Sequence, residues 1–186
     1  MAQGGKTDFL IIGSGVIGLS IGIALLEANQ NAKVAIFEKE SALGKHASGR
    51  NSGVIHAGFY YSPDSLKARF CADGNKELKA LCKENNLPLK EIGKVVVTSN
   101  SNHVERLEAL HRRGLENNIE LELLNASVLA QIEPAAKTHG KFLWSPTTAV
   151  ADPKSVINFL ASRFKKLGGV LIAGQEIALR LSLIHI

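Results

Sequence analysis

Residues 8–38 read DFLIIGSGVIGLSIGIALLEANQNAKVAIFE, and this stretch decides the fold. Asp8–Ile12 and Lys33–Glu38 are short apolar runs typical of buried strands, whereas the apolar spacing of Val16–Glu27 is that of a helix. A strand, a helix and a strand within about 30 residues make a βαβ unit, whose strands are parallel and joined by a right-handed crossover. We therefore predict an α/β protein with a Rossmann-like nucleotide-binding domain.

The turn between the first strand and the helix has the pattern GxGxxG. Its first glycine permits a tight turn, its second lets the backbone approach a pyrophosphate, and its third lets the helix pack closely on the strand. The helix N-terminus adds unpaired N–H groups and the positive end of a dipole. The residues predicted to hold the phosphates are Gly13, Ser14, Gly15, Val16, Ile17 and Gly18.

An acidic residue ends the second strand at Glu38, at the distance from the glycines that a dinucleotide site requires, about 20 residues. Its carboxylate can accept hydrogen bonds from ribose hydroxyls and would repel a 2′-phosphate, which disfavours NADP. Gly22 extends the pattern to GxGxxGxxxG, a spacing seen in many flavoproteins. The motif alone leaves FAD and NAD open.

The next segment, Lys39–Tyr61, is a loop longer than the roughly 15 residues at which loops are usually functional or disordered. Its centre, Ser48–Gly58, carries small and amide side chains that suit a large, flat, extended cofactor, which favours FAD. An NAD domain would proceed directly to its next helix. Further contacts to FAD are predicted for Lys39, Ser48, Asn51, Ser52, Gly53, Ile55 and Ile177.

The remaining chain alternates helices and strands. Pro63–Asn85 is predicted to be a helix with Leu66, Phe70, Leu78 and Leu81 on its apolar side. Strands are predicted at 93–98, 119–124, 142–145 and 170–173, and helices at 102–117, 126–132 and 153–167. Asp152-Pro153 is a favourable helix start, because Asp caps free N–H groups and Pro suits the first helical position. We expect an FAD domain at 1–87 and 151–180, interrupted by a substrate-binding layer at 88–150.

Composition excludes several classes of protein. The 186 residues are 45% hydrophobic and 21% charged, which is ordinary for a folded globular domain. Cys71 and Cys82 are too few for a disulfide framework and lack metal-ligand spacing, so we expect reduced thiols. The lysines and arginines behind the net charge of +5 are scattered along the chain, and few aromatic residues lie beside them. Both features argue against nucleic-acid binding. A small anionic substrate or an acidic membrane surface suits this charge. We expect a cytoplasmic protein, with peripheral contact at the inner face of the membrane as one possibility.

Two consecutive blocks, Ser48–Gly58 and Tyr60–Arg69, resemble the L-2-hydroxyglutarate dehydrogenase/oxidase family of D-amino-acid-oxidase-like flavoproteins. Further matching blocks follow in the same order at Gly93-Lys94, Glu133-Pro134 and Ser145–Asp152. Arg50 and Ala151 depart from some relatives, which leaves the substrate open. The resemblance implies a GR2-type FAD domain with an α+β insertion.

The implied reaction is the oxidation of a small anionic 2-hydroxy acid to a 2-oxo acid by hydride transfer to flavin N5, with oxygen or a quinone as electron acceptor. His56 is the predicted proton acceptor, because a neutral imidazole is a suitable base near pH 7. It could instead hold the loop on the flavin or attach to it covalently. Substrate contacts are predicted for Arg50, Tyr60 and Arg69.

Two alternatives remain from the sequence. One is a sister enzyme acting on an amine, an amino acid or glycerol 3-phosphate. The other is a flavin-binding fragment without turnover. The last six residues, Leu181–Ile186, are those that CTG TCT CTT ATA CAC ATC encodes, a DNA sequence that resembles a sequencing adapter. We therefore expect 181–186 to be a non-native tail and the C-terminal part of the protein to be missing.

Overall fold

The computed structural model describes residues 6–177, apart from the side chain of Ser101, and divides into two compact units. The first unit comprises residues up to Ser52 together with those from Pro153 onward, and the second comprises Gly53–Asp152. The second unit is therefore inserted into the first. The predicted tail 181–186 lies outside the described residues.

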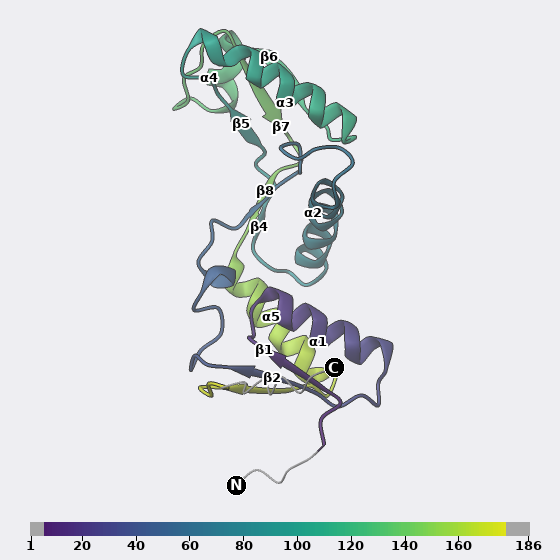
Figure 1. The fold of residues 1–186 in the computed structure, drawn as a ribbon. Helices are drawn as coiled ribbons and strands as arrows, with labels where there is room; N and C mark the ends of the chain where they lie inside the picture. The colour runs from purple at the N-terminus through teal and green to yellow at the C-terminus, as the bar shows by residue number, and fades with distance from the viewer. Residues whose placement is uncertain (1–5, 178–186) are drawn as a thin grey trace. The chain divides into compact units, whose positions relative to one another are not determined.

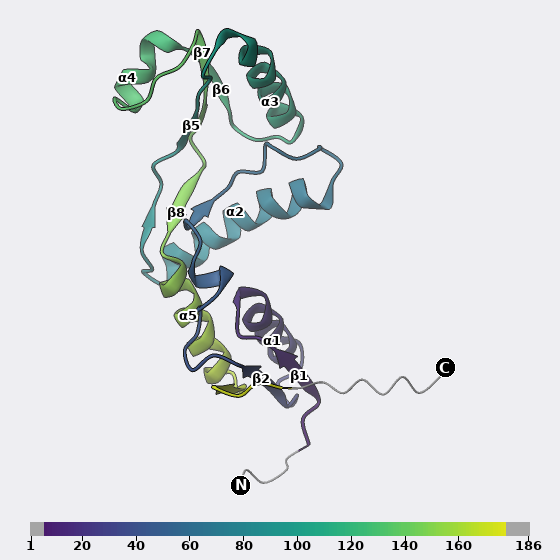
Figure 2. The same cartoon turned by 60° about the vertical axis from the view of Figure 1, so that its left-hand side comes forward.

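The first unit contains a parallel sheet of three strands, in the order β1 (Phe9–Ile12), β2 (Val34–Glu38) and β9 (Val170–Ala173). The register places Ile12 beside Phe37, and Glu38 beside Ala173, at the carboxyl ends of the strands. Helices α1 (Val16–Ala28) and α5 (Pro153–Lys166) pack against each other on one face of this sheet (Figures 1 and 2). The predicted βαβ unit and the return of the chain to the same sheet at β9 are confirmed.

The core of the first unit forms where the two helices meet the middle strand. Leu19 of α1, Ile36 of β2 and Phe164 of α5 are completely buried. Gly22 allows the close approach, because a Cβ there would lie 2.7 Å from the ring of Phe164. Gly22, the last glycine of the extended motif, thus serves the packing of α1 against α5.

The second unit contains two small antiparallel sheets. One has the order β3 (Val54–Ile55), β8 (Ala149–Ala151) and β4 (Leu89–Lys90), and the other has the order β5 (Lys94–Val96), β7 (Lys141–Ser145) and β6 (Glu122–Asn125). The helices of this unit are α2 (Leu66–Glu84), α3 (Val104–Glu116) and the short α4 (Leu129–Ile132). A cluster of Ala57, Phe59, Ile119 and Leu121 fills its centre, with Tyr60 and Val96 packed against it.

Two expectations differ from this arrangement. The first boundary between the units lies at Ser52/Gly53 instead of 87/88, because β3 and β4 both pair with β8 and keep the intervening α2 in the inserted unit. The apolar side predicted for α2 is also wrong at its start. Leu66 and Phe70 are 64% and 60% exposed, whereas the buried positions are Ala68, Asn75 and Cys82.

The thiols of Cys71 and Cys82 are both free, as predicted. In the described part of the chain, no helix combines the length and the apolar character needed to cross a membrane.

Candidate active site

The glycine motif forms the turn that connects β1 to α1. Gly13 has a φ of +97°, a conformation that favours glycine, and Gly15 is the N-cap residue of α1. A Cβ on Gly18 would collide with the carbonyl oxygen of Gly13 and lie 3.2 Å from Cγ2 of Ile11. The first and third glycines therefore have the turn-forming and close-packing roles that the motif predicts.

The N-terminus of α1 opens toward the loop that carries Ser48. The first helical hydrogen bond runs from the Leu19 amide to the Gly15 carbonyl, so the preceding amides have no partner within the helix. The Val16 amide donates to Oγ of Ser48 at 3.1 Å, and a Cβ on Gly15 would lie 2.9 Å from the same oxygen. Ser48 thus lies directly against the amides predicted to face a pyrophosphate.

Glu38 connects the end of β2 to the glycine turn. Its Oε2 accepts from the Ser14 amide at 2.9 Å and from the Ser14 hydroxyl at 2.8 Å, and its Oε1 accepts from the Glu40 amide at 3.0 Å. Burial by itself would raise the pKa of this carboxyl, but these donors and the charge of His46 outweigh it and hold the pKa below its ordinary value. Glu38 is therefore an anion at neutral pH.

The residues present fit a bound dinucleotide. The glycine turn has no side chains at Gly13 and Gly15 that would keep a phosphate from its backbone, and amides of the α1 N-terminus lie beside it. An ionised carboxylate, Glu38, ends the adjacent strand. A carboxylate offers roughly four acceptor positions, of which three are used here, so one is available to a ribose hydroxyl.

The other residues predicted for the cofactor surround this turn or follow it. Asn51 donates to the carbonyls of Ala47 and Ser48, both at 3.0 Å, and so holds the shape of the loop. The chain after β9 runs beside the end of β2, since the Gln175 amide donates to the Glu38 carbonyl at 3.0 Å. This brings the segment that ends at Ile177 to the same edge of the sheet. Lys39 and Ser52 are exposed.

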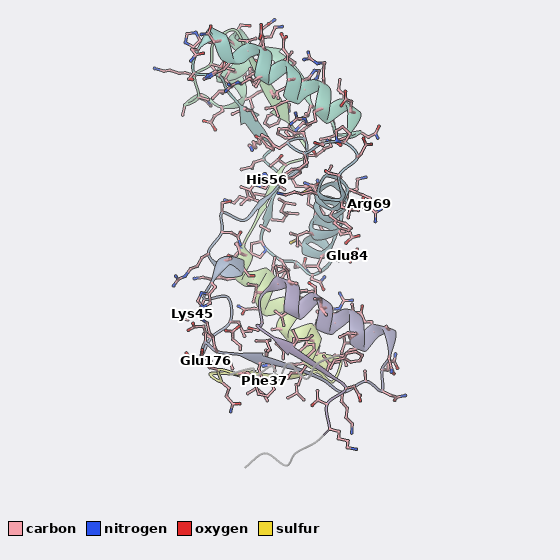
Figure 3. The ribbon with its side chains drawn as sticks, viewed as in Figure 1. Phe37, Lys45, His56, Arg69, Glu84 and Glu176 are labelled. Atoms are coloured by element: carbon pink, nitrogen blue, oxygen red, sulfur yellow. The ribbon has the colours of Figure 1, made fainter. Side chains whose placement is uncertain are left out.

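Gly53, Ile55 and His56 belong to the second unit, where Gly53 precedes β3, Ile55 ends it and His56 follows it. The Gly53 carbonyl accepts from the Ala151 amide at 2.9 Å, and Ile55 is buried opposite Ala149. The side chain of His56 is exposed, and Figure 3 shows it beside β8.

The backbone at His56 is held by a buried amide on α2. Nδ2 of Asn75 lies 3.1 Å from the Ile55 carbonyl, 3.3 Å from the His56 carbonyl and 3.2 Å from the Thr147 carbonyl. Asn75 is only 5% exposed, so these carbonyls replace the water that its amide would otherwise bind. Asn75 therefore determines where the His56 segment lies relative to α2 and the loop before β8.

A lysine and a tyrosine of the second unit contact each other, and the charge of the lysine acts on His56. Nζ of Lys94 donates to the Tyr60 hydroxyl at 2.9 Å and lies 4.7 Å from the centre of the Tyr60 ring. Partial burial lowers the pKa of His56, and the positive charge of Lys94 lowers it further. The imidazole is therefore neutral at pH 7, which is the form that can accept a proton.

The two arginines predicted to contact substrate belong to different units. Arg50 is exposed in the first unit, at the end of the turn Ala47–Gly49. Arg69 is exposed on α2, apart from His56 (Figure 3), with its guanidinium 5.3 Å from the Phe70 ring. Arg69 lines a cleft of about 690 Å³ whose walls also carry Lys76, Asp73, Glu116 and Glu120. Because the cleft carries side chains of both charges, it does not favour either an anionic or a cationic ligand.

Sequence reasoning missed Asn75 and Lys94. A single Asn within a helix has no local signal, because its carbonyl partners come from residues about 20 and 72 positions away. Lys94 lies in the Gly93-Lys94 block, one of the blocks that resemble the family. Its place in that block, directly before an apolar strand, is the sequence feature that marks it as a candidate site residue.

Comparisons with known proteins agree with this geometry. A family model for the FAD dependent oxidoreductases, DAO, matches residues 8–181, and the chain belongs to this family. The predicted family resemblance, the fold class and FAD as the cofactor are thereby confirmed.

The individual relatives are more specific. The chain is 40% identical over 171 residues to the L-2-hydroxyglutarate dehydrogenase of Escherichia coli (strain K12), covering 92% of this chain and 40% of that protein. It is 39% identical to the enzyme of the same name from Indibacter alkaliphilus, covering 90% of this chain and 42% of the relative. The FAD-bound L-alpha-glycerophosphate oxidase from Mycoplasma pneumoniae has a TM-score of 0.83 and 27% identity over 94% of this chain and 46% of that one. The chain thus spans about two fifths of the length of the curated relatives it matches.

Proposed function

We propose that the protein is an FAD-dependent oxidoreductase that oxidises a small 2-hydroxy acid, L-2-hydroxyglutarate, to its 2-oxo acid. The observation that carries the proposal is the similarity to L-2-hydroxyglutarate dehydrogenases over nine tenths of the chain, a stretch long enough to include the His56 segment of the second unit. A nucleotide-binding domain without a substrate site does not account for the similarity in that segment.

The first unit would hold the cofactor. The turn at Gly13–Gly18 and the N-terminus of α1 would bind the pyrophosphate, and Glu38 would accept a hydrogen bond from a ribose hydroxyl. When bound, FAD supplies the acceptor for the hydride of the substrate, at its N5 atom. Ser48, Asn51 and the segment ending at Ile177 would complete the walls of this site.

The second unit would supply the proton acceptor. Oxidation of a hydroxyl carbon releases the hydroxyl proton together with the hydride, so a base must take that proton. His56 suits this role because its side chain is exposed, its pKa is lowered and its backbone is fixed by Asn75. Of the two other roles open to His56, orienting the flavin requires no neutral imidazole, whereas covalent attachment also needs an unprotonated ring nitrogen.

Reoxidation needs a second partner, for which we propose oxygen or a quinone. A quinone would bring a cytoplasmic protein to the inner face of a membrane. The formal charge of +5 favours peripheral contact with acidic lipid headgroups there.

A sister function is supported by one observation, the likeness to the Mycoplasma pneumoniae glycerophosphate oxidase. Anaerobic mixing of the FAD-loaded protein with a substrate panel separates the candidates. We expect L-2-hydroxyglutarate to bleach the oxidised flavin absorbance, and glycerol 3-phosphate, glycine and L-proline to leave it unchanged. Bleaching by one of the latter in place of the hydroxy acid would overturn the proposed substrate. Bound FAD that no substrate reduces would favour a binding fragment without turnover.

A further inference from the structure

The second unit holds a half-buried lysine whose charge is balanced by no carboxylate of residues 6–177. Nζ of Lys94 lies 2.9 Å from the Tyr60 hydroxyl, and no acidic side chain between residues 6 and 177 comes within ion-pair distance of it. The aromatic rings of Tyr60 and Phe59 lie 4.7 and 5.8 Å from the ammonium and stabilise it partly. A charge that is partly removed from water and lacks a counter-ion favours an anionic ligand.

Rigid packing fixes the position of Lys94. The preceding Gly93 has a φ of +68°, and a Cβ there would collide with the ring of Trp144. The Gly93 amide donates to the Thr148 carbonyl at 3.0 Å, and Lys94 itself pairs with Ser145 across β5 and β7. The ammonium is therefore presented by the start of a sheet strand instead of a flexible loop.

Tyr60 offers a second donor at the same place. Its hydroxyl oxygen accepts from Lys94, so its own proton can be donated to another acceptor. The residue is held at its other end, where the Tyr60 carbonyl accepts from Nη1 of Arg113 at 3.0 Å and its ring lies 4.3 Å from that of Phe59. An ammonium and a phenol thus form a fixed pair of donors.

We propose that Lys94 and Tyr60 bind a carboxylate group of the substrate, close to His56. This inference rests on the proposed function, because it assigns the group that recognises the acid. The segments that carry Lys94 and His56 both lie against the start of β8, since the Gly93 amide donates to the Thr148 carbonyl and Ile55 pairs with Ala149. A bound carboxylate would balance the charge of Lys94, and its substrate carbon chain would then lie near the proton acceptor.

The donor set suits a carboxylate better than a phosphate. Phosphate sites in proteins typically combine a lysine or arginine with a helix N-terminus or several backbone amides, which together match three acceptor oxygens. The pair here consists of one ammonium and one phenol, which matches the single negative charge and two oxygens of a carboxylate. The small number of donors therefore favours a hydroxy acid over glycerol 3-phosphate.

The test is the affinity of the FAD-loaded protein for 2-oxoglutarate, measured by calorimetry, in the variants Lys94→Met and Tyr60→Phe. Methionine keeps the apolar stem on the two rings and removes the charge. We expect binding to weaken about 10- to 100-fold in Lys94→Met and about 2- to 10-fold in Tyr60→Phe, the ranges for charged and neutral hydrogen bonds. Lys90→Met removes an exposed lysine of the same unit and should change the affinity less than about two-fold.

A second ligand identifies which carboxylate is bound. 2-Oxovalerate keeps the 2-oxo acid group and replaces the distal carboxylate by a methyl group. Weaker binding of 2-oxoglutarate alone in Lys94→Met would assign the distal carboxylate, and equal weakening of both ligands would assign the one beside the oxo group. Either result supports the proposal.

Unchanged affinity in both variants, while the parent protein binds 2-oxoglutarate, would overturn the assignment of Lys94 and leave the proposed function standing. A parent protein that contains FAD and binds neither 2-oxo acid would overturn both. If Lys94→Met fails to retain FAD, Lys94→Gln and Tyr60→Phe decide the question, because glutamine removes the charge but keeps a polar side chain and phenylalanine keeps the ring. Unchanged affinity for 2-oxoglutarate in both of these variants would then overturn the assignment.

Discussion

The carboxylate of Glu38 accepts hydrogen bonds from both the amide and the hydroxyl of Ser14, at 2.9 and 2.8 Å, across 24 residues of chain. Ser14 is completely buried and Glu38 is 9% exposed, so this contact joins the glycine turn to the end of β2 inside the first unit. The same carboxylate is the one predicted to meet the ribose. Cofactor affinity and the stability of the turn should therefore change together.

Replacing Ser14 by alanine removes the hydroxyl donor and leaves the buried carboxylate with one partner fewer. We expect the free energy of unfolding to fall by about 1.5–3 kcal/mol, the usual range for a hydrogen bond to a charged group. Urea denaturation measures the change. Ser99→Ala, at an exposed serine of the second unit, should cost under about 0.5 kcal/mol. Equal losses of unfolding free energy in the two variants would show that the hydrogen bond from the Ser14 hydroxyl to Glu38 does not stabilise the fold.

Glu38 should also make stability depend on pH. Its pKa in the folded protein lies below the ordinary value of 4.5, so folding favours the ionised carboxylate. Its contribution is complete above the unfolded pKa and is lost as the pH falls through the lower, folded pKa. The difference in unfolding free energy between the parent protein and Glu38→Gln should be largest near neutral pH and shrink in acid. A difference that is constant with pH would contradict this assignment.

Adding one methyl group at Gly18 should abolish FAD binding. The new Cβ would collide with the Gly13 carbonyl oxygen, so the turn would have to open. The matched control is Gly74→Ala, where a Cβ meets nothing within 4 Å and alanine should stabilise α2 by about 0.5–1 kcal/mol. The ratio of flavin to protein after purification measures both variants. Stoichiometric flavin in Gly18→Ala would show that the close approach is dispensable.

His56→Ala should slow anaerobic flavin reduction about 10²- to 10⁴-fold at saturating substrate, the range for loss of a general base. In the parent protein the reduction rate should rise with pH through a midpoint below 6.5, because only the neutral imidazole accepts a proton. Lys94→Met removes a charge that lowers this pKa and should move the midpoint to higher pH. Stopped-flow absorbance gives both quantities. A near-normal rate in His56→Ala would reject the role of His56 as the proton acceptor.

Asn75→Ala removes a buried amide that lies within 3.1–3.3 Å of three carbonyls and should lower the unfolding free energy by about 1–3 kcal/mol. It should also slow flavin reduction, because the His56 backbone loses its support. Asn85→Ala removes an exposed amide that bonds Leu81 at the end of the same helix, and its cost should stay under about 1 kcal/mol. A stability loss in Asn75→Ala without a slower reduction would limit Asn75 to a structural role.

Local patterns sufficed to predict the first unit. The glycine turn, its adjoining helix and strands, and the helix start at Pro153 depend on residues close in sequence, so periodicity and capping chemistry are informative. Strands of two residues, such as β3 and β4, have no periodicity and exist because β8 pairs with both. The boundary between the two compact units depends on that pairing, which local patterns do not reveal.

The exposed start of α2 shows the same limit. Leu66 and Phe70 match an apolar helical face, yet Ala68, Asn75 and Cys82 are the residues that pack inward. Asn75 is buried because distant carbonyls satisfy its amide, which no local pattern reveals. For the candidate site, the turn and Glu38 could be predicted, while the partners of His56 required the tertiary structure.

Anaerobic single turnover with L-2-hydroxyglutarate is the most direct test of whether the FAD-loaded protein oxidises a 2-hydroxy acid. We expect the flavin to be fully reduced and 2-oxoglutarate to appear in an amount equal to the reduced flavin, while the D enantiomer leaves the flavin oxidised. Fully oxidised flavin in the presence of saturating L-2-hydroxyglutarate, with no 2-oxoglutarate formed, would contradict it.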